Sequence, residues 1–206
     1  GQTTYRASAP DVAYNATNNE FLVVWQGETN VGGQVDQETE IWTQRLSSTG
    51  TEIGAEFRIS DMNGIGNTIG IADNPRVAWN ATNNEFLVVW QASEPGNDFR
   101  ITTTGADNDF YSTSTTPDLV WNSDNNEYLV VYNKNASQTV GTEIHGQILT
   151  NLGAKTGSND FAISNMGSTS STDYNAYNPS VTYNATNDQY LVVWDGDDNT
   201  APLINK

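Results

Sequence analysis

Clustered carboxylate and amide side chains near the C-terminus are the residues of this chain best suited to hold a metal ion. The stretch DGDDNT supplies oxygen ligands at close spacing, from Asp195, Asp197, Asp198 and Asn199. A tight loop can fold such ligands around Ca²⁺, which takes about six to eight oxygens. DNDF, from Asp107, and VDQETE, at 35–40, add more acidic residues, but none of these stretches has EF-hand spacing. A solvated acidic loop is the favoured interpretation of these residues, with a bound Ca²⁺ as the alternative and no other cofactor expected.

Catalytic constellations are weaker than the cation cluster. His145 is the single histidine, which excludes a multi-histidine metal site, and we expect it to be structural. Propeller-fold glycoside hydrolases use paired carboxylates near the axis. Asp11 and Asp118 suit that role, but Arg76 and Ser180 stand at the equivalent places in the other copies of the repeat described below. We therefore predict that the protein is not an enzyme, and keep a hydrolase-like propeller as the second alternative.

Two tyrosines in the stretch STDYNAYN are suited to bind a sugar. Tyr174 and Tyr177 could stack on a sugar ring, and the neighbouring carboxylate and amides could bond its hydroxyls. The predicted ligand-binding residues are Tyr174, Tyr177, Asp173, Asn175 and Asn178.

An internal repeat must position these residues. The phrase YNATNNEFLVVWQ, at 14–26, returns as WNATNNEFLVVWQ at 79–91 and in looser form at 121–133 and 183–195. Each copy follows a proline with an alternating run, a polar turn and a β-branched run, which indicates a hairpin of two strands. Three of the four sequons, at Asn15, Asn80, Asn135 and Asn184, are this turn, so turn formation explains them. The aromatic that ends each second strand is expected to wedge between sheets: Trp25, Trp90, Tyr132 and Trp194.

Further alternating runs complete each unit. Residues 40–60 and 143–164 each hold two such runs around a glycine-bearing turn, and FRITTTG with DFYSTS form an abbreviated pair in the second copy. Four strands per unit of about 40 to 60 residues are typical of a β-propeller blade. We predict an all-β propeller of four-stranded antiparallel blades in a single repeat domain, 1–206. The blades are approximately 9–60, 74–114, 116–164 and 178–206, with a strand at 3–8 closing the last. A segment of a larger propeller, a self-associating half and a solenoid stay open.

Strand alternation places two kinds of connection at opposite ends of the blades. The turns NATNNE, SSTG and NLG are short and similar, whereas the connections at 27–38, 61–74, 133–141, 165–178 and 195–200 are long and dissimilar. Variation confined to one face of a uniform scaffold is typical of a binding surface. We expect ligand contact on the long-loop face, with tolerated insertions as the alternative.

The strongly negative net charge of the chain disfavours two classes of partner. The chain carries 25 acidic and 8 basic residues, a net charge of −17, which disfavours nucleic acid and anionic membranes. No run is long and apolar enough to insert in a membrane. The chain starts at Gly1 without a signal-peptide pattern, and we expect it to be a processed form or part of something longer.

The repeat pattern resembles the YLVVW-type repeats of large bacterial secreted and cell-surface proteins. The pattern runs from the proline through VAYN, NNEYLVVW and EIHGQIL to DFAIS, over nearly the whole chain. The resemblance implies propeller blades in a bacterial extracellular or cell-surface protein and transfers no catalytic residue. We expect a non-catalytic binding module for carbohydrate or a surface protein. The first alternative is a structural or assembly unit of a larger surface protein or filament, which could self-associate through blade edges.

Overall fold

The computed structural model describes residues 6–28, 38–62, 70–93, 99–102, 113–135, 141–166 and 174–196. Within them the chain is all-β, with twelve antiparallel strands in four sheets and no helix. The chain divides into two compact units, residues 1–100 and 101–206. The all-β prediction is therefore confirmed, and closure of the blades into one ring stays a prediction.

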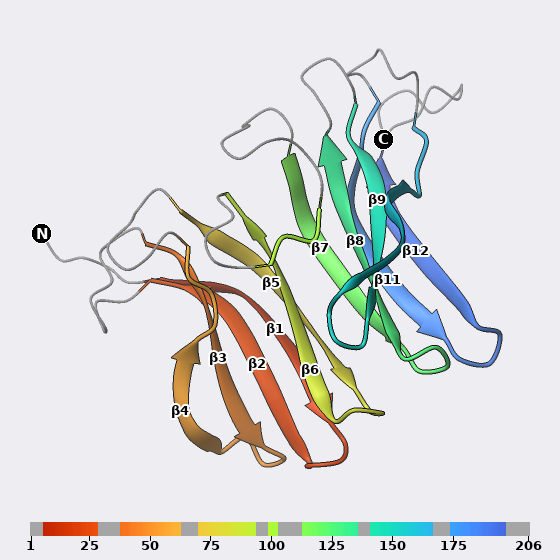
Figure 1. Cartoon of the computed structure of the whole chain (residues 1–206). Helices are drawn as coiled ribbons and strands as arrows, with labels where there is room; N and C mark the ends of the chain where they lie inside the picture. The colour runs from red at the N-terminus through yellow and green to blue at the C-terminus, as the bar shows by residue number, and fades with distance from the viewer. Residues whose placement is uncertain are drawn as a thin grey trace, which may run out of the picture. The chain divides into compact units, whose positions relative to one another are not determined.

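The first unit holds a four-stranded sheet and a two-stranded sheet (Figure 1). The larger sheet has the order β1-β2-β3-β4, so every strand pairs with its neighbour in sequence, as expected for a blade. The smaller sheet is the hairpin of β5 and β6. The strands are β1 (Ala7–Asn15), β2 (Glu20–Gly27), β3 (Glu40–Ser47), β4 (Glu52–Arg58), β5 (Ala72–Asn80) and β6 (Glu85–Ala92).

The second unit repeats this plan with a sheet of order β7-β8-β9-β10 and a hairpin of β11 and β12. Its strands are β7 (Thr113–Asn122), β8 (Glu127–Asn135), β9 (Glu143–Thr150), β10 (Lys155–Ala162), β11 (Ala176–Asn184) and β12 (Gln189–Gly196). The four-strand prediction is thus confirmed for the first and third copies of the repeat.

The second copy differs from the prediction. Residues 99–102, expected to begin a third strand, are not in a strand. Thr113 and Ser114, expected to end a fourth strand, instead begin β7 and pair with Asn135 and Lys134. The alternating Ser and Thr residues here could belong to a separate fourth strand or to β7. They join β7 because β8 extends to Asn135 and supplies their partners. The rest of the expected strands, at 103–112, lies outside the described residues.

The strand expected at 3–8 also differs where it is described. Ala7 and Ser8 belong to β1 and pair with Gly27 and Gln26, because β2 runs on past the proline of its partner strand. Residues 1–5 and the APLINK tail, expected to complete the last blade, lie outside the described residues.

Each proline sits inside its strand, at a β-bulge, rather than opening it. The register of every hairpin shifts across the proline, and the residue before it has a positive φ of 46° to 50°. A bulge suits proline because the extra residue needs no ladder donor. The positive-φ residues are Ala9, Asn74, Thr116 and Asn178.

The hairpin turns are held by asparagine, as predicted. Asn15 Oδ1 accepts a hydrogen bond from the Asn18 N–H at 2.9 Å, and Asn80 Oδ1 accepts from the Asn83 N–H at 3.1 Å. Asn15 and Asn80 are buried, at 1 % and 0 % exposure. The last turn residue, Asn19 in the first copy, has a positive φ of 55° that asparagine tolerates. Turn formation therefore accounts for these two sequons.

Face-to-face stacking of the two sheets forms the core of each unit. In the first unit Leu22 and Val24 of β2 pack with Val77 of β5, alongside Phe86 and Val88 of β6. Because side chains alternate along a strand, one face of β2 can face the hairpin while the other points away.

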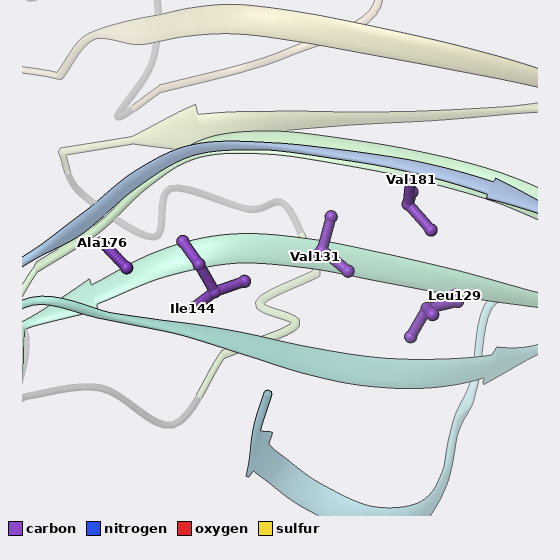
Figure 2. Close-up of a cluster of buried hydrophobic side chains, with 5 residues drawn as sticks. All are labelled: Leu129, Val131, Ile144, Ala176 and Val181. Atoms are coloured by element: carbon purple, nitrogen blue, oxygen red, sulfur yellow. The ribbon is translucent and has the colours of Figure 1, made fainter. Parts of the chain in front are cut away.

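The second unit has the equivalent core. Leu129 and Val131 of β8 cluster with Val181 of β11, together with Ile144 and Ala176 (Figure 2). One face of β2 and one face of β8 are therefore covered by the hairpin of the same unit, whereas the equivalent strand β12 leaves Leu191 and Val193 exposed.

A carboxylate ties the sheets together in each unit. Asp11 Oδ2 accepts a hydrogen bond from the Val77 N–H at 2.8 Å, and Asp118 Oδ2 accepts from the Val181 N–H at 2.8 Å. The turn ends are also linked, since Asn15 Nδ2 donates to Asn84 Oδ1 at 2.8 Å. The same contacts therefore fix both hairpins on their four-stranded sheets.

We predict that Ala9→Asn stabilises the protein. Left-handed backbone costs about 1 to 2 kcal/mol for an ordinary residue and less for asparagine, which stands at the equivalent bulge in two other copies. We expect a gain of about 0.5 to 1 kcal/mol in unfolding free energy by urea denaturation. Ala9→Val, which puts a β-branched residue in the same conformation, should lower it. Equal stability of the two variants would contradict a strained bulge.

We also predict that Asp118→Ala destabilises the second unit. It leaves the Val181 N–H without its charged acceptor, and such bonds contribute about 1.5 to 3 kcal/mol, with the lower end expected because Asp118 is partly exposed. Ser180 occupies the equivalent strand position and is exposed, so Ser180→Ala is the matched control and should change stability by less than about 0.5 kcal/mol. Similar losses for both variants would argue against the tie.

Candidate binding surface

The two ends of each unit differ as the repeat predicts. Antiparallel order places the β1–β2 and β3–β4 turns at one end of the first unit, and the β2–β3 and β4–β5 connections at the other. The second unit has the same arrangement. We call the end that carries the β2–β3 or β8–β9 connection the loop end. The strand termini that frame it are described, and most of the connections themselves are not.

A glutamate and a serine build the loop end of the first unit. Ser60 donates a hydrogen bond through its hydroxyl to Glu40 Oε2, and the Met62 N–H donates to Glu40 Oε1 at 3.0 Å. The Ile41 N–H donates to Ser60 Oγ at 2.7 Å. Glu40 thus holds the chain that leaves β4 against the start of β3.

The second unit uses the same device. Ser164 donates to Glu143, the Met166 N–H donates to Glu143 Oε1 at 2.9 Å, and the Ile144 N–H donates to Ser164 Oγ at 2.7 Å. The sequence shows a Glu…Ser-x-Met pattern at equivalent positions of the two copies. Its role in holding the loop end was not predicted from the sequence.

The predicted sugar-binding residues divide into an exposed part and an anchored part. Tyr177 is 41 % exposed, and it pairs in register with exposed Asp195, so both lie on one face of the β11–β12 hairpin. Asn175 is anchored, because its Oδ1 accepts from the Thr142 N–H at 2.8 Å.

The remaining residues of that prediction are described only in part. Asn178 is exposed at the bulge, with φ 50°. Tyr174 is partly buried, and Asp173 lies outside the described residues. The structure therefore places Tyr177 beside Asp195, whereas Asn175 holds the backbone at Thr142.

The predicted calcium site is described at a single residue. Asp195 is exposed on β12, and Asp197, Asp198 and Asn199 lie outside the described residues, as does Asp107. Within the described ranges no group of three or more His, Cys, Asp or Glu side chains is placed to hold a metal ion. In VDQETE, Glu38 and Glu40 are buried, and Glu40 binds Ser60 and Met62. The calcium site stays a prediction.

Two of the predicted aromatic wedges pack on residues at the loop end of their unit. Trp90 packs on the cluster of Ile41, Met62 and Ala72. Trp194 is 37 % exposed, and its Nε1 donates to Met166 Sδ at 3.4 Å. Both contacts join the hairpin to its four-stranded sheet, as the wedge prediction expected for these two residues, whereas Tyr132 bonds to Asp160 within its own four-stranded sheet.

A polar cluster in the second unit was missed by the sequence analysis. Tyr132 donates a hydrogen bond through its hydroxyl to Asp160, and Lys134 Nζ lies 3.3 Å from Asp160 Oδ2. His145 Nδ1 lies 2.7 Å from the Asp160 carbonyl oxygen. Burial, and then the bond to Asp160, raise the pKa of Tyr132. Asp160 and Tyr132 are buried beside the register shift in β10, so this carboxylate and hydroxyl are bonded to each other inside the sheet.

The carboxylates considered for catalysis have structural partners. Asp11 and Asp118 accept backbone hydrogen bonds between the sheets of their own units. His145 lies beside the bulge, as the structural interpretation expected.

Comparisons of the chain with protein-family models, curated proteins and solved structures find no match. The described residues contain no helix long and apolar enough to cross a membrane.

We predict that Glu40 makes stability depend on pH. Burial raises its pKa above the usual 4.5, outweighing the bonds from Ser60 and Met62 and the nearby Arg58, which lower it. The folded protein therefore holds this proton more tightly than the unfolded chain. The resulting stability is fully present below the unfolded pKa and is lost as pH rises through the folded value. The melting temperature of wild type minus that of Glu40→Gln should increase as pH is lowered from neutral to about 4.5.

The control for this experiment is Glu52→Gln, which removes a carboxyl group from an exposed position of the neighbouring strand. Identical pH profiles for the two differences would show that the buried position of Glu40 has no effect on its titration.

Proposed function

We propose that this protein is a non-catalytic extracellular binding module, built from propeller-type blades and carried by a bacterial surface or secreted protein. The observation that carries the proposal is the contrast between framework and connections. Equivalent hydrogen bonds recur in both units at the turns, between the sheets and at the loop end. The connections that leave the loop end differ in length and composition. A fixed frame with variable loops suits ligand recognition.

Carbohydrate is the ligand class that the exposed residues favour. Tyr177 offers an aromatic face and Asp195, its register partner, offers a carboxylate on the same face. Stacking on an aromatic ring combined with hydrogen bonds to a carboxylate is suited to a sugar. Ca²⁺ held by Asp195 with Asp197 and Asp198 would order this end of the hairpin.

An assembly role is the second candidate, because apolar side chains are exposed on sheet faces, as argued below. We do not propose hydrolysis. The backbone bonds accepted by Asp11 and Asp118 favour a structural role for both carboxylates.

Tyr177→Ala should weaken glycan binding by roughly 10-fold or more, as expected for an aromatic anchor worth about 1 to 3 kcal/mol. A glycan array identifies the ligand, and calorimetric titration then compares the variants with and without Ca²⁺.

Tyr14→Ala provides the matched control. Tyr14 is 43 % exposed, close to the 41 % of Tyr177, and it lies at the opposite end of its sheet, with its hydroxyl bonded to Asn19. Glycan binding that is lost in Tyr14→Ala but retained in Tyr177→Ala would place the ligand at the wrong end. Absence of any bound glycan would reject the ligand class.

A further inference from the structure

The outer face of the last hairpin exposes apolar side chains that its equivalents bury. Leu191 and Val193 of β12 are 61 % and 54 % exposed. Their equivalents in the first copy, Leu22 and Val24, are 7 % and 0 % exposed, because the β5–β6 hairpin stacks on them. The second unit has no further sheet stacked on β12 in its described residues.

The outer face of β1, at the other end of the repeat, also exposes side chains whose equivalents are buried. Val12 is 55 % exposed and Tyr14 is 43 % exposed. Val77 and Val181, the equivalents of Val12, are 7 % and 9 % exposed, because each packs against the four-stranded sheet of its own unit.

These two faces are the unmatched halves of one interface that the molecule already forms twice. In each unit the Leu and Val of a second strand receive the Val of the next hairpin's first strand. Among the described residues, no valine packs on Leu191 and Val193 in this way, and no Leu and Val pair receives Val12. We propose that the Val12 face of a second copy of this chain seats on the Leu191–Val193 face, so that copies associate head to tail.

The polar groups agree with this pairing. Val77 and Val181 each donate their N–H to a carboxylate on the sheet below. Val12 pairs with Val23 in the same register as Val77 pairs with Val88, so its N–H has the equivalent orientation. The position that would receive it is Ser180, which is exposed and whose hydroxyl can accept the bond. A neutral acceptor also adds no charge to an interface between chains of net charge −17.

Two properties of the association follow. The surfaces in contact are different, so the contact is heterologous and gives a closed ring or an open filament. Like charge on the copies opposes the contact, and salt screens it, with a Debye length of about 10 Å at 0.1 M. Association should therefore strengthen with salt and with protein concentration. The proposal does not depend on carbohydrate binding.

The first test measures mass by sedimentation velocity over a concentration series at low and high salt. We expect wild type to form a dimer or larger species, and Leu191→Arg to raise the apparent dissociation constant by at least about 10-fold. Leu152→Arg is the matched control, since Leu152 is 82 % exposed in the β9–β10 turn, outside both faces. Circular dichroism checks that each variant keeps its strand content. A wild-type monomer throughout, or equal effects of the two changes, overturns the proposal.

The second test identifies the faces, and it is clean because the chain has no cysteine. A Val12→Cys chain is mixed with a Val193→Cys chain and treated with a bifunctional maleimide. Stacked sheets lie about 10 Å apart, beyond the roughly 7 Å between Cα atoms that a disulfide tolerates. We expect cross-linked pairs of the two different chains, and few when Leu152→Cys replaces Val193→Cys.

The double variant, with Val12→Cys and Val193→Cys in one chain, distinguishes a second copy from the chain's own Val12 face as the occupant. Cross-linking within monomers of this variant, without cross-links between the single variants, would show that the chain's own Val12 face is the occupant, and the second-copy proposal would be wrong.

Discussion

The stacking of a hairpin on one face of a four-stranded sheet is the contact on which each unit depends. An isolated two-stranded hairpin is at best marginally stable in water. The β5–β6 and β11–β12 hairpins therefore need the apolar surface of β2 and β8, which Val77 and Val181 cover. The carboxylates of Asp11 and Asp118 fix the position of that contact by accepting an N–H from the incoming strand. This explains why the hairpin phrase is so uniform among the copies: its second strand supplies the stacking surface, and its first strand supplies the valine that covers the surface of the preceding copy.

The contact also gives the repeat a second level of order. Asp11 and Asp118 occur in the first sheet of each unit, whereas Arg76 and Ser180 hold the same place in the second. The larger period is therefore a pair of sheets. In the sequence alone, the mixed residue types at these four places disfavour paired catalytic carboxylates. The structure explains the alternation. Within a unit only the four-stranded sheet is followed by a hairpin, and its aspartate accepts a backbone N–H from that hairpin.

Local chemistry predicted the elements well and long-range pairing poorly. The hairpins, their asparagine turns and the strands of the first and third copies follow from period-two alternation and turn residues, which act within a few positions. The bulges at the prolines, and the assignment of Thr113 and Ser114 to β7, depend on how far the partner strand extends. At the candidate site the aromatic and amide residues of STDYNAYN were predicted from local composition, but the anchoring of Asn175 to Thr142 needs a partner 33 residues away. The Tyr132–Asp160 cluster depends on a bulge in β10 in the same way.

The two proposed activities share one surface, which connects them physically. Tyr177, Asp195, Val193 and Leu191 all lie on the outer face of the last hairpin, because Tyr177 pairs with Asp195 and β12 alternates sides at every residue. Tyr177 and Asp195 lie at its loop end, and Leu191 lies nearer the uniform turn. A second copy seated on Leu191 and Val193 would therefore border the sugar-binding pair and could cover it. Ligand and assembly would then compete if the pair is covered, or cooperate if the incoming copy adds contacts to the ligand. Because thermodynamic coupling is reciprocal, glycan binding must change the association constant by the same factor that association changes glycan affinity.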